Sequence, residues 1–148
     1  METKNNCELP DANPPSGEIN TLLSRAHTVA VVGLSDNPGR DSYRVAVYLQ
    51  EHGYRIIPVN PLKGEILGEK SYPDLGSVPE KIDIVDIFRA VDAIPGIVDE
   101  AIKVGAGAVW MQLGLAHNES AKKARDAGLF VVQSKCMKVE HHKATSEK

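Results

Sequence analysis

The stretch from Thr28 to Pro61 constrains the fold of this 148-residue chain more than any other. It reads TVAVVGLSDNPGRDSYRVAVYLQEHGYRIIPVNP. An apolar run breaks at Gly33, a small polar loop follows, and an amphipathic stretch ends at Gly53 before a second apolar run that ends at Val59. Short apolar runs on either side of helical periodicity predict a strand, a loop, a helix and a second strand. This order is typical of the first half of a βαβ unit.

The loop after the first strand departs from the dinucleotide-binding pattern. Gly33 stands at the first glycine of G-x-G-x-x-G, but Ser35 and Pro38 take the other two glycine positions. The second strand ends in Val-Asn-Pro, without the acidic residue that usually holds the ribose hydroxyls of NAD. The unit therefore favours a phosphorylated nucleotide other than NAD.

The same loop carries groups suited to phosphate. Gly33 allows a tight turn that brings backbone N–H groups close to a ligand. The N-terminus of the following helix adds free N–H donors and roughly half a positive charge, and Ser42 is also its predicted N-cap. The candidate ligand-binding residues of the loop are Gly33, Leu34, Ser35, Arg40 and Ser42. The alternative is a plain strand-to-helix turn with a cap.

Further strands and helices alternate along the rest of the chain. Strands are expected at 82–88, 108–111 and 129–132, helices at 16–26, from Asp92 to before Gly105, and at 118–127, and a short hairpin around 65–72. This alternation predicts an α/β fold: a single Rossmann-like, three-layer domain with a mostly parallel five-stranded sheet. We expect a flexible N-terminal tail over residues 1–16, the domain over 17–143 and a C-terminal tail over 144–148.

Two acidic residues affect the expected place of the third strand. Asp83 and Asp86 interrupt its apolar pattern, which favours a sheet edge over a central position. Three residues apart on a strand, they point to opposite faces and do not act as a carboxylate pair. Ligands of such sheets lie beyond the carboxyl ends of the strands, which selects the loops 33–41, 60–64, 88–91, 112–117 and 133–136.

Composition excludes several function classes. A net charge of −3 provides no basic field for nucleic acid. No apolar run approaches the roughly 18 residues of a membrane helix, and the N-terminus lacks the apolar core of a secretory signal. The two cysteines do not make a disulfide framework, so reduced thiols in the cytoplasm are expected.

Several stretches in this order resemble a known family. They are VGLSDNPGRDSYRVAVYL, GYRIIPVNPLKGEILGEKSYPDL, DIVDIFRA, AVWMQLG and KCMKVEHHK, and together they span about residues 20 to 143. The chain resembles the small stand-alone CoA-binding proteins, which are similar to the N-terminal domain of the succinyl-CoA synthetase α subunit.

The resemblance implies that coenzyme A or an acyl-CoA lies across the carboxyl rim. The pyrophosphate would lie by Gly33 and Ser35, and the adenosine near Val59, Asn60 and Pro61. Lys63 matches the family lysine that faces a CoA phosphate, although a plain loop lysine is the alternative. The positions near the pantetheine would be Phe88, Arg89, Gln112 and Gly114.

The resemblance carries over binding and not ligase chemistry. The synthetase needs a second domain with a phosphorylated histidine, and His117, His141 and His142 lie outside the matching motifs. We therefore expect CoA binding without catalysis, with a protein partner or a homo-oligomer left open. Two alternatives stay open: an NADP-binding redox sensor or oxidoreductase domain, using Arg55 or Lys63, and the nucleotide-binding half of a two-subunit acyl-CoA ligase.

Cys136 follows the last strand and is expected at the same rim. Free cysteines are commonly buried and inert, so a structural role is expected. A reactive thiol, activated by the nearby Lys135 and Lys138, is the alternative. The spacing of Cys136, Glu140, His141 and His142 fits no zinc motif, and no metal site is expected.

Overall fold

Five parallel strands form the central sheet of the computed structural model, which describes residues 8–146. The strand order is β2-β1-β5-β6-β7, and each neighbouring pair is parallel. The strands are β1 (Thr28–Val32), β2 (Arg55–Val59), β5 (Ile84–Ile87), β6 (Ala108–Met111) and β7 (Phe130–Val132). The predicted α/β class and the five-stranded parallel sheet are confirmed.

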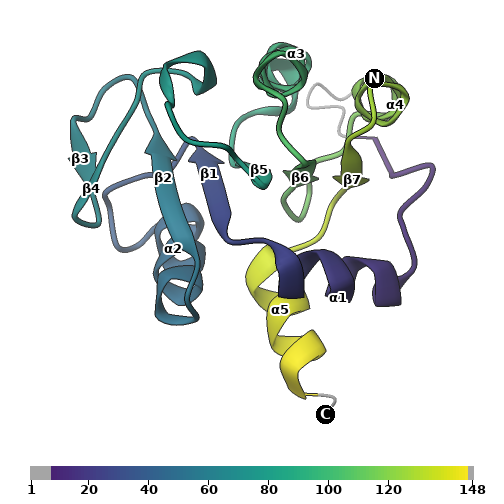
Figure 1. Cartoon of the computed structure of the whole chain (residues 1–148), viewed down its shortest axis with the longest axis horizontal. Helices are drawn as coiled ribbons and strands as arrows, with labels where there is room; N and C mark the ends of the chain where they lie inside the picture. The colour runs from purple at the N-terminus through teal and green to yellow at the C-terminus, as the bar shows by residue number, and fades with distance from the viewer. Residues whose placement is uncertain (1–7, 147–148) are drawn as a thin grey trace.

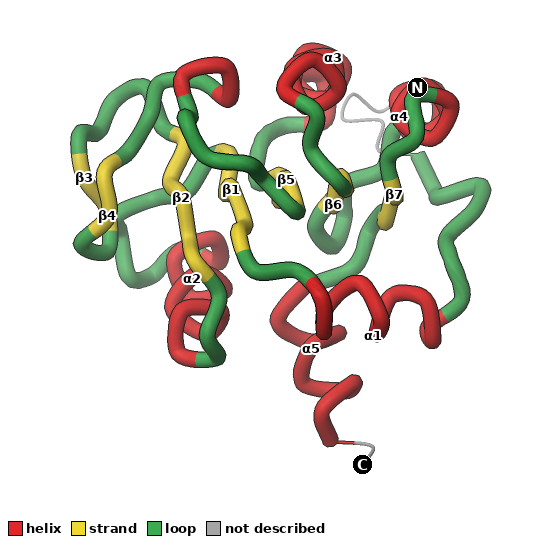
Figure 2. The backbone as a smooth tube through the Cα atoms, viewed as in Figure 1, coloured by secondary structure: helices red, strands yellow, loops and turns green. Residues whose placement is uncertain are grey.

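Helices cover both faces of this sheet and complete three layers (Figure 1). One face carries α1 (Ser16–Arg25), α2 (Asp41–Glu51) and α5 (Met137–Ser146), and the other carries α3 (Ile94–Val104) and α4 (Asn118–Asp126). Two 3₁₀ turns, η1 (Leu75–Ser77) and η2 (Val91–Ala93), lie in the connections. The predicted hairpin is present as β3 (Glu65–Ile66) and β4 (Glu69–Lys70), beyond the β2 edge (Figure 2). None of the helices within residues 8–146 has the length and apolar character needed to cross a membrane.

The strands are buried on both faces, which explains their continuous apolar sequences. Val31 and Trp110 pack with residues of α1, α2 and α5, whereas Val32 and Val85 pack with residues of α3 and α4. Since successive side chains of a strand point to opposite faces, Asp86 shares the face of Val31 and Trp110, its register partners. This places a carboxyl group beneath α2 and α5.

The predicted edge position of the third strand is wrong, because β5 is the middle strand of the five. Asp83 lies just before the strand, where its carboxylate accepts the backbone N–H groups of His27 (2.8 Å) and Thr28 (2.9 Å). A carboxylate that binds the free donors at the start of a neighbouring strand is compatible with the sheet centre. Asp86 is fully buried and has a different role.

Helix starts also differ from the sequence-based expectation. Arg40 is the N-cap of α2, so Ser42 lies inside the first turn and its predicted capping role is wrong. Asp92 lies in η2, so the helix expected from Asp92 begins at Ile94, with Pro95 in its first turn. His117 caps α4, accepting the backbone N–H of Ser120 at its Nδ1 (3.2 Å).

The segment before α1 contacts the β7 side of the sheet. Gln133, which follows β7, donates its backbone N–H to Asn13 Oδ1, and its carbonyl oxygen accepts from Asn13 Nδ2, both at 2.8 Å. The Asn13 amide thus pairs with the backbone much as a neighbouring strand does. Residues 1–7 of the expected N-terminal tail and residues 147–148 of the C-terminal one lie outside the described residues, and the tail boundaries stay predictions.

Candidate functional site

The direction of strand addition reverses between β1 and β5, which is where open α/β sheets bind ligands. Gly33 lies at this point with φ +91°, and its N–H donates to the carbonyl oxygen of Val59 (3.0 Å). A Cβ added at Gly33 would lie 2.3 Å from the carbonyl oxygen of Phe88 and 2.8 Å from Arg89 Cδ. The carboxyl ends of β1, β2 and β5 therefore meet at a residue that has to be glycine.

Internal hydrogen bonds hold the loop between β1 and α2. Ser42 Oγ accepts the backbone N–H of Ser35, and Ser35 Oγ accepts that of Asn37, both at 3.0 Å. Asn37 Oδ1 in turn accepts the N–H of Gly39 (2.9 Å). Leu34 is fully buried, so its side chain belongs to the core. The two serine hydroxyls that were predicted to face phosphate thus also shape the loop.

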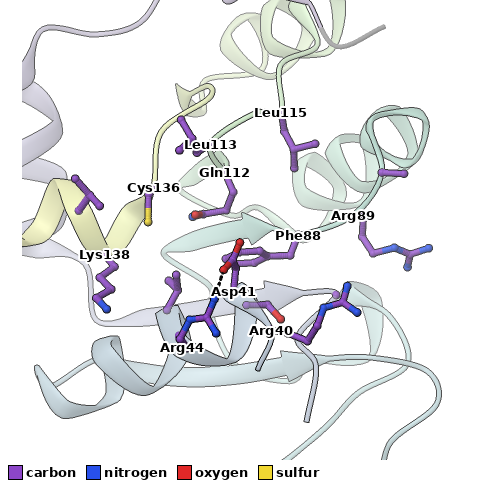
Figure 3. A pocket seen from close by; sticks show the side chains of 15 residues that line it. Arg40, Asp41, Arg44, Phe88, Arg89, Gln112, Leu113, Leu115, Cys136 and Lys138 are labelled. Atoms are coloured by element: carbon purple, nitrogen blue, oxygen red, sulfur yellow. Dashed lines mark hydrogen bonds and ion pairs between the residues drawn. The ribbon is translucent and has the colours of Figure 1, made fainter. Parts of the chain in front are cut away.

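A cavity of about 630 Å³ opens beside this loop (Figure 3). Of the predicted site residues, those that line it are Gly33, Arg40, Ser42, Phe88, Arg89 and Gln112. The remaining lining residues, which were not among the predicted ligand-binding residues, are Asp41, Arg44, Val45, Ala90, Leu113, Leu115, Cys136, Lys138 and Val139. The cavity thus extends from the start of α2 to the start of α5.

The charges in the cavity are mostly positive. Arg40, Arg44, Arg89 and Lys138 line it, against the single carboxylate Asp41. Arg44 pairs with Asp41 (Nη2 to Oδ1, 2.5 Å) and donates to the carbonyl oxygen of Gly39 (2.8 Å). Together with the N-terminus of α2, these cations make the outer part of the cavity suited to an anion.

Residues after β2 lie next to the loop and do not line the cavity. Asn60 Nδ2 donates to the carbonyl oxygen of Leu34 (2.9 Å), which ties this segment to the loop between β1 and α2. Lys63 Nζ pairs with Asp36 Oδ2 (2.9 Å), and this contact lowers the pKa of the Asp36 carboxyl. Val59 is buried and Pro61 is exposed. We call the segment formed by Val59, Asn60, Pro61 and Lys63, which lies beside the cavity, the ledge.

Gly114, the remaining predicted site residue, also lies outside the cavity lining. It has φ +90°, and its N–H donates to Ser134 Oγ (3.1 Å). This bond links the loops after β6 and β7. The neighbouring Leu113 and Leu115 do line the cavity, so the loop contributes through its apolar side chains.

Behind the inner end of the cavity, Gln112 of the lining forms a buried polar pair with Asp86. Gln112 is 5% exposed, and its Nε2 donates to Asp86 Oδ1 (2.6 Å). Asp86 Oδ2 has no hydrogen-bond partner among residues 8–146. Burial raises the pKa of Asp86 to about 7, against the lowering effect of the Gln112 hydrogen bond. Asp86 was not a predicted site residue, although an aspartate within an apolar strand was the available signal.

Cys136 and α5 form the wall opposite the arginines. Cys136 is half-buried and lines the cavity, as its position after β7 predicted. The helix is held to α2 by a hydrogen bond between Tyr48 Oη and His141 Nδ1 (2.8 Å). Burial, with the nearby His52 and His142, lowers the pKa of His141. Within residues 8–146, no three His, Cys, Asp or Glu side chains gather as metal ligands.

Known proteins share both sequence and structure with this chain. The CoA binding domain family matches residues 27–142. An uncharacterized protein, YneT, from Bacillus subtilis is 40% identical over 129 residues, which cover 87% of this chain and 96% of that protein. A solved structure of a hypothetical protein from Pyrococcus horikoshii OT3 superimposes with a TM-score of 0.88 at 39% identity, covering 98% of this chain and 99% of that one.

A second group of relatives is much longer. The ADP-forming acetate–CoA ligase of Methanocaldococcus jannaschii is 30% identical over 95 residues, which cover 64% of this chain and 14% of the ligase. This chain thus corresponds to a small part of that enzyme.

Proposed function

Because this chain belongs to the CoA binding domain family, we propose that it binds coenzyme A or an acyl-CoA in the cavity between α2 and α5. The observation that carries the proposal is the division of this cavity. One end has the α2 N-terminus with Arg40 and Arg89, and the other has Gln112 and Cys136 with apolar neighbours and the single cation Lys138. CoA has the same division, with a highly charged nucleotide and a mostly uncharged pantetheine arm.

Charge complementarity supports this orientation. The phosphates of CoA bring about four negative charges near neutral pH. Arg40, Arg44 and Arg89 offset them with guanidinium groups suited to phosphate. We place the adenosine on the ledge formed by Val59, Asn60, Pro61 and Lys63, beside the loop between β1 and α2. The pantetheine then runs past Phe88 toward Gln112. Gly114 lies behind Gln112, in the same loop after β6.

The NADP alternative has weaker support in the geometry. Arg55 lies at the amino end of β2, far from the carboxyl rim, and pairs with Glu69 and Glu80, both at 2.6 Å. A ribose 2′-phosphate would have to break both of these pairs to gain the Arg55 guanidinium. Lys63, which pairs with Asp36, is equally placed for either nucleotide.

The ligase-half alternative has one specific observation in its favour. Part of this chain aligns with acetate–CoA ligases, among them the α subunit of a Pyrococcus furiosus enzyme. A partner chain would then supply the catalytic domain. We place the protein in the cytoplasm, with reduced thiols, and propose binding without catalysis for the isolated chain.

Calorimetric titration of the purified protein with CoA, NAD and NADP tests the proposal. We expect CoA to bind more tightly than either dinucleotide, because only CoA matches both ends of the cavity. Tighter binding of NADP would reject the proposal in favour of the redox alternative.

A further inference from the structure

We infer that Asp86, acting through Gln112, sets whether the inner end of the cavity offers a hydrogen-bond acceptor or a donor, and so whether the site prefers the free thiol of CoA or a thioester. This inference rests on the proposed function. It concerns a residue that does not line the cavity and was not among the predicted site residues.

The first step is the orientation of the Gln112 amide. An amide side chain has one acceptor end and one donor end. Gln112 Nε2 donates to Asp86 Oδ1 (2.6 Å). The carbonyl end of the amide therefore faces the cavity that Gln112 lines. In Figure 3 the Gln112 side chain reaches toward Cys136, at the end of the cavity away from Arg40.

The second step is that protonation of Asp86 reverses this arrangement. A carboxylate only accepts hydrogen bonds, whereas a carboxylic acid has one O–H donor. The proton comes from solvent and is held by Oδ2, which has no partner among residues 8–146. A half-turn of the carboxyl group brings this O–H to Gln112 Oε1, because a buried O–H left without an acceptor carries a desolvation penalty. The amide then turns so that Nε2 faces the cavity.

The third step concerns the pH at which the reversal occurs. Asp86 is fully buried in the middle strand of the sheet, and burial raises its pKa to about 7. The reversal therefore falls close to neutral pH. The elements that cover this face carry titratable and charged groups as follows: Glu18 and Arg25 on α1, Asp41, Tyr43, Arg44, Tyr48 and Glu51 on α2, Lys135 and Cys136 before α5, and Lys138, Glu140, His141, His142 and Lys143 on α5. None of them contributes to the shift, whose causes are burial and the Gln112 hydrogen bond.

The chemical consequence follows from the two forms of the ligand. The thiol of CoA carries a proton that it donates weakly, and a thioester carbonyl only accepts. Ionised Asp86 presents the Gln112 carbonyl and matches the thiol, so it favours free CoA above pH 7. Protonated Asp86 presents the Gln112 N–H and matches a thioester, so it favours acyl-CoA below pH 7.

The experiment measures the affinities of CoA and acetyl-CoA between about pH 5.5 and about pH 7.5, where an ordinary thiol stays mostly protonated. The readout is the ratio of the two dissociation constants. Both ligands have the same phosphates, so the effect of phosphate ionisation cancels in this ratio. We expect the ratio to change about three- to tenfold across this range, the effect of one neutral hydrogen bond. The midpoint should lie near pH 7.

Asp86→Asn tests the assignment, because an amide of the same shape does not titrate. Its ratio should be independent of pH. Asp126→Asn, on the far helix α4 where Asp126 pairs with Lys122, is the matched control and should keep the wild-type profile. A pH-independent ratio in the wild type, or a wild-type profile in Asp86→Asn, would overturn the inference while leaving CoA binding intact.

A measurement on the wild type covers the case in which Asp86→Asn does not fold. The side-chain amide signal of Gln112 in a nitrogen–proton NMR spectrum should titrate with the same midpoint near pH 7. A signal that stays constant across this range refutes the reversal. Absence of binding for both ligands refutes the proposed function itself, and the inference with it.

Discussion

Replacing Gly33 with alanine tests the idea that the carboxyl ends of three strands meet at one backbone position. Alanine at φ +91° costs about 1–2 kcal/mol, because its Cβ approaches the neighbouring carbonyl group. The new Cβ would also lie 2.3 Å from the carbonyl oxygen of Phe88, which is backbone and has to move. Overpacking of this kind adds about 1–3 kcal/mol, so we expect a total loss of about 2–5 kcal/mol in the free energy of unfolding.

Gly53 provides a matched control for this substitution. Its φ is +93°, and nothing lies within 4 Å of a Cβ added there. Gly53→Ala should therefore lose only the conformational part, about 1–2 kcal/mol. Urea unfolding of wild type and both variants, compared at a common slope, measures the two losses. Equal losses would refute the claim that the loops after β1 and β5 touch at Gly33.

Three further predictions concern the ledge, the docking of α5 and the cavity thiol. Lys63→Ala should weaken CoA binding about tenfold and dephospho-CoA binding less. A hydrogen bond to a charged phosphate contributes about 1.5–3 kcal/mol, and solvent exposure of Lys63 reduces this contribution. Equal losses of affinity for both ligands in a titration would mean that Lys63 does not contact the 3′-phosphate. His141 has a lowered pKa, so the unfolded state binds the proton more readily and stability falls as the pH drops below about 6.5. His141→Gln should lose less melting temperature than the wild type on acidification, and an unchanged pH profile would count against this role of His141. The isolated protein should not hydrolyse acyl-CoA in a thiol-release assay, and turnover that Cys136→Ser abolishes would make Cys136 catalytic instead.

Local sequence patterns were sufficient to predict the strands and most of the helices. Apolar runs bounded by glycines mark buried parallel strands, and the loop at Gly33 followed from a glycine between a strand and an amphipathic helix. Such signals depend on residues that are adjacent in sequence, so a sequence pattern contains all the information they need.

Strand order depends on contacts between distant residues, and here the local reading failed. Asp83 and Asp86 indicated an edge strand, but Asp83 binds the start of β1 and Asp86 binds Gln112 of the loop after β6. These partners are 55 and 26 residues away. The same limit applies to the cavity, where α5 brings Lys138 and Val139 opposite Arg44.

The central claim is that CoA binds in the cavity between α2 and α5. A CoA titration followed by backbone amide shifts in nitrogen–proton NMR spectra tests it most directly. We predict the largest shifts at Gly33, Ser42, Arg89 and Gln112, which line that cavity. Shifts confined to the separate hollow between α1 and α5, at residues such as Thr21 and Ala144, or no shifts at saturating CoA, would contradict it.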